Sequence, residues 1–151
     1  MDMANDPPSR ESEATIWPEL SVRRGRAAVE FYKAAFGAVE RYRVGGTDEH
    51  EAVVAQLSVG DASFWVSDEA PENRNFSPES VGGSTVRLLL MVQDPHSVVR
   101  RAIASGATEI AAVNEEHGWL VGRIEDPFGH HWEIGRPLTP WPPGDGAHDD
   151  A

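Results

Sequence analysis

The chain has 151 residues, and its 40% hydrophobic and 25% charged content is typical of a globular protein with one domain or two small fused modules. It contains no cysteine, which excludes disulfides, thiolate metal sites and a cysteine nucleophile. The formal net charge of -12 opposes nucleic-acid binding, which needs clustered Lys and Arg, and no apolar run approaches the ~20 residues that span a bilayer. We therefore expect a cytoplasmic protein with neither nucleic acid nor membrane as a partner.

The first half of the chain predicts one strand, one helix and three further strands. These elements are expected at residues 14–22, 25–36, 39–44, 52–59 and 62–67. A polar tail at residues 1–13 precedes them and is expected to be disordered. Pro18 favours a sheet edge or a bulge for the first strand, because proline cannot donate to a ladder. Gly37 is placed to end the helix.

A linker of loop composition at residues 68–83 follows, and then the same order of elements begins again. The second set is expected at residues 84–92, 95–105, 108–113, 119–125 and 131–135. Leu20-Ser21-Val22 matches Leu90-Met91-Val92, an offset of about 70 residues. The Pro/Gly/Asp-rich end at residues 137–151 predicts a second disordered tail.

The repeat predicts the fold class α+β, with two βαβββ modules at residues 14–67 and 84–136. Each module supplies a curved, incompletely closed sheet, and the paired sheets enclose a cavity that neither module encloses alone. A ferredoxin-like fold or another α+β sandwich is the alternative, but neither requires the second half to copy the first.

The most informative local stretch is the hairpin near the end of the second module. Asp126-Pro127-Phe128-Gly129 has the composition of a tight turn. In the strand that follows, Trp132 and Ile134 share one face, and His131, Glu133 and Gly135 share the other. Glu133 therefore points either into a pocket or into water.

Other catalytic signatures are missing from the sequence. His130 and His131 are adjacent, so on a strand they point to opposite faces and do not chelate one ion together. No GxSxG nucleophile motif, Walker motif or dinucleotide-binding glycine pattern is present.

The duplicated order, the segment AAVEFYKAAFGA and the closing IEDPFGHHWEI together resemble the vicinal oxygen chelate superfamily. That superfamily includes glyoxalase I, bleomycin-resistance proteins, fosfomycin-modifying enzymes and extradiol dioxygenases. The resemblance covers residues 15–136 and implies a homodimer, because small members of the superfamily usually pair.

Catalytic members of the superfamily hold a divalent metal with side chains from four sheet positions. The resemblance places these positions at Trp17, Gln56, Arg87 and Glu133. Only Gln56 and Glu133 carry donor atoms, whereas Arg87 has no lone pair, repels a cation and is suited to pair with Glu133. A shift of the register by one or two residues would bring Glu19 or His50 into the set.

We therefore expect a metal-free binding protein of the glyoxalase and bleomycin-resistance type, with a small organic ligand in an inter-sheet cavity and no cofactor. The ligand-binding residues are predicted to be Trp17, Gln56, Trp65, Arg87, Trp119 and Glu133. Indole rings offer stacking surfaces, and Arg87 suits a carboxylate or phosphate. Trp65 and Trp132 have the alternative role of filling the sheet cores.

The alternative function is a metal-dependent lyase, isomerase or dioxygenase. It would hold a divalent Ni, Zn, Mn or Fe ion through Gln56 and Glu133, with Glu133 as a ligand and possible base.

Overall fold

The computed structural model describes residues 14–144, so the predicted tail at residues 1–13 and the segment 145–151 lie outside the described residues. In chain order the elements are β1 (Glu19–Val22), α1 (Gly25–Phe36), β2 (Val39–Gly45), β3 (Val53–Val59), β4 (Ala62–Asp68), η3 (Pro71–Asn73), α2 (Pro78–Val81), β5 (Arg87–Met91), α3 (Pro95–Ala104), β6 (Thr108–Glu116), β7 (Trp119–Glu125) and β8 (His131–Pro137). No helix among these residues is long and apolar enough to cross a membrane.

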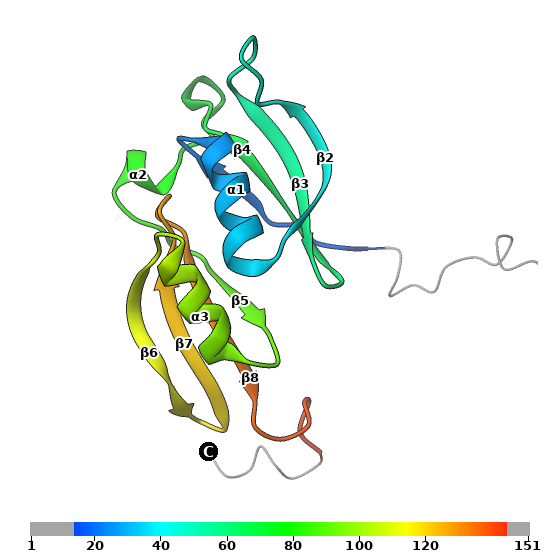
Figure 1. The fold of residues 1–151 in the computed structure, drawn as a ribbon, viewed down its shortest axis with the longest axis vertical. Coiled ribbons are helices and arrows are strands. Elements are labelled where there is room, and N and C mark those ends of the chain that lie inside the picture. Colours follow the sequence, from blue (N-terminus) through cyan, green and yellow to red (C-terminus); the bar gives the residue numbers. More distant parts are fainter. Residues whose placement is uncertain (1–13, 145–151) are drawn as a thin grey trace, which may run out of the picture.

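The strands form two four-stranded sheets of identical topology. The first has the order β1-β4-β3-β2 and the second β5-β8-β7-β6. In each sheet the first and last strands of the module pair in parallel, and the other neighbours pair antiparallel. The predicted α+β fold of two βαβββ modules is confirmed, and both sheets remain open (Figure 1).

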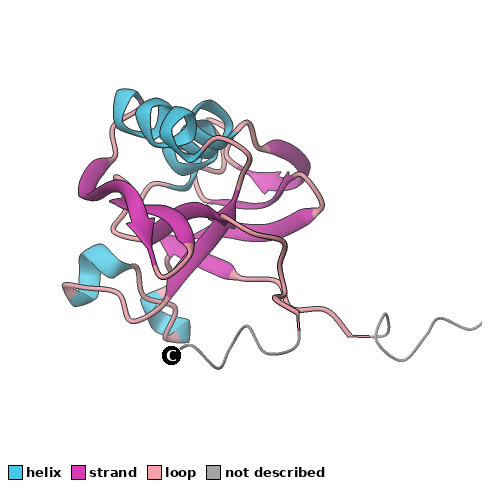
Figure 2. Cartoon of the chain, turned by 90° about the horizontal axis from the view of Figure 1, so that it is seen from below, coloured by secondary structure: helices cyan, strands magenta, loops and turns pink. Residues whose placement is uncertain are grey.

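Each module covers one face of its sheet with its own helix. Alternation along β3 buries Val53, Ala55 and Leu57 beneath α1, and Ile124 and Ile134 are buried on the corresponding face of the second sheet. The helices α1 and α3 contact each other, and Figure 2 shows the longer helices together on one side of the strands. We call the sheet faces turned away from α1 and α3 the distal faces.

The helix α1 begins against the end of its own sheet. The backbone N–H of Gly25 donates to Oδ1 of Asp68 at 3.0 Å, and the N–H of Val53 donates to Oδ2 at 2.6 Å. A Cβ atom at Gly25 would lie 2.2 Å from Cγ1 of Val53. Only glycine fits this close approach. The helix ends at Gly37, as predicted, with a φ of 69°.

An aromatic cluster joins the two modules. Phe31 and Phe36 of α1 pack on side chains of the closing hairpin, with 6.1 Å between the ring centroids of Phe31 and Phe128 and 4.8 Å between those of Phe36 and Trp132. All four rings are buried. The hairpin that closes the second module is therefore also part of the core shared with the first.

A buried carboxylate lies at the centre of this interface. Oδ2 of Asp126 accepts hydrogen bonds from the Tyr32 hydroxyl at 2.5 Å and from Nε1 of Trp132 at 3.0 Å. Oδ1 accepts from the backbone N–H groups of Phe128 at 2.9 Å and His130 at 3.0 Å. Burial, followed by the Asp126 charge, raises the pKa of Tyr32 well above its ordinary value. Asp126 thus shapes its own turn and binds the first module.

The predicted loop at residues 68–83 contains two short helices, η3 and α2, and this part of the prediction was wrong. The hydroxyl of Ser77 accepts the N–H of Ser80 at 3.2 Å, and Pro78 occupies the first helical turn. A single turn is too short to produce a periodic hydrophobic pattern, so composition alone indicated a loop.

Most strand boundaries also differ from the prediction, and β5 covers Arg87–Met91 instead of residues 84–92. β1 starts at Glu19, after Pro18, and is an edge strand of its sheet as expected. β6 continues to Glu116, and β8 ends at Pro137, inside the segment predicted as a tail.

Candidate functional site

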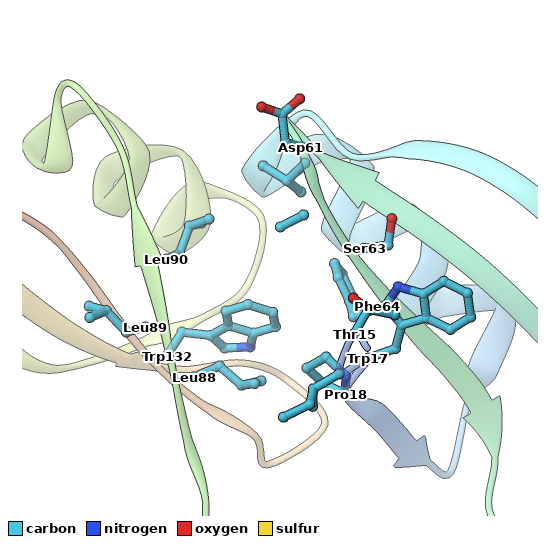
Figure 3. Close-up of a pocket in the computed structure, with 13 residues that line it drawn as sticks. Thr15, Trp17, Pro18, Asp61, Ser63, Phe64, Leu88, Leu89, Leu90 and Trp132 are labelled. Atoms are coloured by element: carbon cyan, nitrogen blue, oxygen red, sulfur yellow. The ribbon is translucent and has the colours of Figure 1, made fainter. Parts of the chain in front are cut away.

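A cleft opens between the two modules, next to the aromatic cluster (Figure 3). Its volume is about 250 Å³, and we call it the inter-module cleft. Its lining combines the segment before β1, the β3–β4 hairpin, β5 and the core indole of β8: Thr15, Ile16, Trp17, Pro18, Val59, Asp61, Ala62, Ser63, Phe64, Leu88, Leu89, Leu90 and Trp132.

The walls of the cleft are mostly apolar because they are the edges of the two cores. Leu88 and Leu90 extend from β5 toward the space, whereas Leu89 points away (Figure 3). Trp132 projects toward the cleft, but its Nε1 already donates to Asp126. Trp17 lies on the opposite wall and is 49% exposed. A ligand would therefore meet aliphatic and indole surface on both sides.

A row of side chains crosses the distal face of the first sheet. The strand register places Glu19, Trp65, Gln56 and Tyr42 side by side on β1, β4, β3 and β2. The ring centroid of Trp65 lies 6.2 Å from that of Trp17 and 5.8 Å from that of Tyr42. We call Trp17, Tyr42, Gln56 and Trp65 the aromatic row. Trp65 faces away from α1 and lies outside the core, whereas Trp132 is buried in it.

The distal face of the second sheet is charged instead. Nε of Arg87 lies 3.5 Å from Oε1 of Glu133, which confirms that the two residues pair. Nε of Arg123 donates to Nδ1 of His131 at 3.1 Å, and Nε2 of His131 lies 3.7 Å from Oε1 of Glu125. We call these five residues the charged face.

Sequence reasoning did not select Arg123. Its position was nevertheless available, because pairing across the Asp126–Gly129 turn sets Arg123 opposite Glu133 on the same face. The match of Leu20 with Leu90 also makes Trp65 and Glu133 corresponding positions of the two modules. Equivalent positions of the two modules thus carry an indole in the first sheet and a carboxylate in the second.

The six residues predicted to bind ligand do not form one site. Trp17 belongs to both the inter-module cleft and the aromatic row, where it lies with Trp65 and Gln56, whereas Arg87 and Glu133 lie on the charged face. Trp119 packs against Trp141, with 5.3 Å between ring centroids. Across residues 14–144, no hydrogen bond or ion pair joins the residues predicted on the first sheet with those on the second.

The four positions where a metal was considered do not fit a divalent cation. Trp17 and Arg87 offer no lone pair, and the guanidinium of Arg87 lies at the carboxylate of Glu133. Within the described part of the chain, no three His, Asp or Glu side chains are grouped so that they could hold an ion. Of the two residues that a shifted register would add, Glu19 lies beside Trp65 in the first sheet, and His50 lies in the exposed loop before β3.

Comparison with known proteins shows the family and the fold to which this chain is similar. The family model described as a glyoxalase-like domain matches residues 19–135. An uncharacterized protein of Mycobacterium tuberculosis is 35% identical over 130 residues, which cover 83% of this chain and 76% of that protein. A gene product from Arabidopsis thaliana of known structure is 31% identical, with a TM-score of 0.65 over 82% of this chain and 98% of that one.

Two further solved structures share the fold at lower identity. TioX from Micromonospora sp. ML1 has a TM-score of 0.65 and 22% identity, covering 83% of this chain and 99% of that one. The fosfomycin resistance protein FosX from Listeria monocytogenes, in complex with Mn(II) and a dihydroxypropylphosphonic acid, has a TM-score of 0.63 and 13% identity, covering 85% and 91%.

Proposed function

This chain belongs to the glyoxalase-like family of the vicinal oxygen chelate superfamily, and on that premise we propose that it binds a small organic ligand between its modules without a metal ion. The observation that carries the proposal is the inter-module cleft, whose walls come from both halves of the duplicated fold. Apolar walls with few polar groups are usual for small-molecule sites.

The size and lining of the cleft indicate the class of ligand. An apolar cavity of roughly 150 Å³ accommodates a single benzene ring, so a cleft of about 250 Å³ suits one or two fused rings. Trp17 offers an exposed indole face at the wall, and Leu88 and Leu90 offer aliphatic surface opposite it. A flat, largely uncharged ring system is the ligand class that these surfaces favour.

The cleft is tested by titrating the protein with 2-naphthamide, a neutral two-ring probe, and measuring heat of binding and tryptophan fluorescence. The variant Ala62→Trp adds an indole at an exposed position of the lining and occupies part of the cleft. It should therefore raise the dissociation constant of the probe at least tenfold. Ala104→Trp, at the exposed end of α3, is the matched control and should bind like the parent. Equal affinity in all three proteins would remove the cleft as the site.

The donor set of the charged face supports a metal-free protein. Arg87 already satisfies part of the Glu133 carboxylate, and a cation placed there would meet a permanent positive charge. Calorimetric titration with Ni, Zn, Mn and Fe(II) should give no stoichiometric tight binding. Tight binding that is lost in Glu133→Gln would instead contradict the metal-free protein and favour the metal-dependent lyase, isomerase or dioxygenase alternative.

We also propose that the protein pairs as a homodimer through the outer part of the first sheet. Tyr42, Val44 and Val54 are each about half exposed on its distal face and form a contiguous apolar surface. Light scattering after size exclusion should give twice the chain mass, and Val44→Glu should shift the population toward the monomer. A monomer at every concentration would contradict this pairing.

A further inference from the structure

The charged face lies outside the inter-module cleft, because none of its five residues lines that cleft. We propose that it binds a small oxyanion, such as a phosphate or a carboxylate group, through the guanidinium groups of Arg87 and Arg123. Arg87 and Glu133 are two of the four positions at which the resemblance to the superfamily implies metal ligands, but the two arginines present N–H donors, which suit an anion.

The two arginines converge over the strand between them. Arg87 on β5 lies beside His131 in the register, yet its Nε reaches Glu133, two residues further along β8. Arg123 on β7 lies beside Glu133, yet its Nε reaches His131, two residues back. Each side chain therefore leans across β8 toward the other. Since neighbouring strands are separated by about 4.8 Å, both guanidinium groups lie over the same short stretch of β8.

Both arginines retain donors for a ligand. Each of these contacts is made through Nε, and among the described residues no hydrogen bond engages the terminal nitrogens of either guanidinium. The side chain of Arg87 is 54% exposed, and Arg123 is half-buried. A guanidinium presents its remaining N–H groups in a planar fork that matches the oxygens of a carboxylate or phosphate.

The acidic and imidazole groups around the arginines define how an anion would bind. Glu133 is the competing partner of Arg87, because its Oε1 lies at the guanidinium. Glu125 is directed at Nε2 of His131 instead. Nδ1 of His131 accepts a hydrogen bond from Arg123 and so carries no proton in this arrangement. An oxyanion that binds both arginines must therefore displace or share the Arg87 contact with Glu133.

Because Glu133 competes with the anion for Arg87, variants of the arginines and of Glu133 should change the phosphate affinity in opposite directions. Inorganic phosphate is titrated by calorimetry, with chloride used to hold the ionic strength constant. Arg87→Met and Arg123→Met should each weaken phosphate binding at least tenfold. Glu133→Gln should tighten it about threefold or more, because the amide keeps the shape of the side chain and removes the repelling charge.

Matched controls separate this site from general charge effects and from the cleft. Arg100→Met removes an exposed arginine of α3, on the other side of the sheet, and should leave the phosphate affinity unchanged. Ala62→Trp should also leave it unchanged, because the cleft does not include either arginine. Circular dichroism checks that each variant is folded.

The proposal is overturned if the parent protein binds no phosphate at millimolar concentrations. It is also overturned if Glu133→Gln weakens binding, or if Arg100→Met lowers the affinity as much as the two site variants do. If the parent protein binds phosphate but not 2-naphthamide, the proposed ligand site in the cleft is contradicted and the proposed oxyanion site is supported.

Discussion

At the scale of single residues, the side chain of Asp126 links the two modules. Its two carboxylate oxygens accept four hydrogen bonds, and its side chain is almost fully buried. Asp126→Asn replaces one accepting oxygen by an amide donor that faces existing donors. We expect the free energy of unfolding to fall by about 2–4 kcal/mol, measured by urea denaturation. Asp61→Asn, at the exposed β3–β4 turn, is the control and should change it by less than about 0.5 kcal/mol.

The pKa of Tyr32 predicts a loss of stability in alkaline solution. Burial raises the pKa of Tyr32 well above its ordinary value of about 10, so the unfolded chain releases this proton at a lower pH than the folded chain does. The stabilisation is complete below about pH 10 and decreases as the pH rises further. Urea midpoints at pH 9 and above should fall less steeply in Tyr32→Phe than in the parent. Parallel pH profiles would contradict this role for Tyr32.

The sequence predicted some of these residue roles and missed others for a physical reason. The opposite orientations of Trp132 and Glu133 follow from the two-residue period of a strand. The pairing of Arg87 with Glu133 follows from their opposite charges at sheet positions that the superfamily resemblance implies. Asp126 was predicted only as a turn residue. Its partner Tyr32 is 94 positions away in the chain, and a local sequence pattern does not predict a contact over that separation.

At the scale of elements, the start of α1 depends on the absence of a side chain at Gly25. A Cβ there would lie 2.2 Å from Cγ1 of Val53 and 2.4 Å from Oδ2 of Asp68, so Gly25→Ala must displace the carboxylate that anchors the helix. We expect a loss of about 1–3 kcal/mol in the free energy of unfolding. Gly83→Ala is the matched control, because a Cβ at Gly83 meets nothing within 4 Å. Equal stabilities of the two variants would rule out this packing constraint.

Element boundaries were predicted best where a glycine lies at the end of the element. The span of α1 was predicted fully, since the apolar spacing begins after Gly25 and Gly37 ends it. β6 was predicted too short because its pairing with β7 shifts register twice, between Glu109 and Ala111 and between Ala111 and Asn114. Such irregularities break the alternation on which a strand prediction depends.

At the scale of the whole molecule, the aromatic cluster couples the stabilities of the two modules. Phe128 is buried against Phe31 and Tyr32 of the other module. We therefore expect one cooperative unfolding transition, with coincident midpoints by tryptophan fluorescence and circular dichroism. Phe128→Ala should lower the shared midpoint, with a loss of about 3–5 kcal/mol. Two separated transitions in the parent protein would show that the modules unfold independently.

The module order was readable from the repeat, but the position of the cleft was not. Two matched sets of elements suffice to predict two sheets of equal topology. The cleft depends instead on how α1 packs against α3 and on which ends of β4 and β5 this packing leaves apart. For the same reason, six residues expected in one cavity are distributed over the cleft, two distal faces and the Trp119–Trp141 contact.

The bond between Tyr32 and Asp126 also explains what the recognisable parts of this sequence encode. The segments AAVEFYKAAFGA and IEDPFGHHWEI are distant in the chain and meet at this bond, so together they form the joint between the two halves. His131 and Glu133 alternate with the packed residue Trp132 and point away from that joint. A substitution at His131 or Glu133 therefore changes the chemistry of the distal face without removing any group that forms the joint.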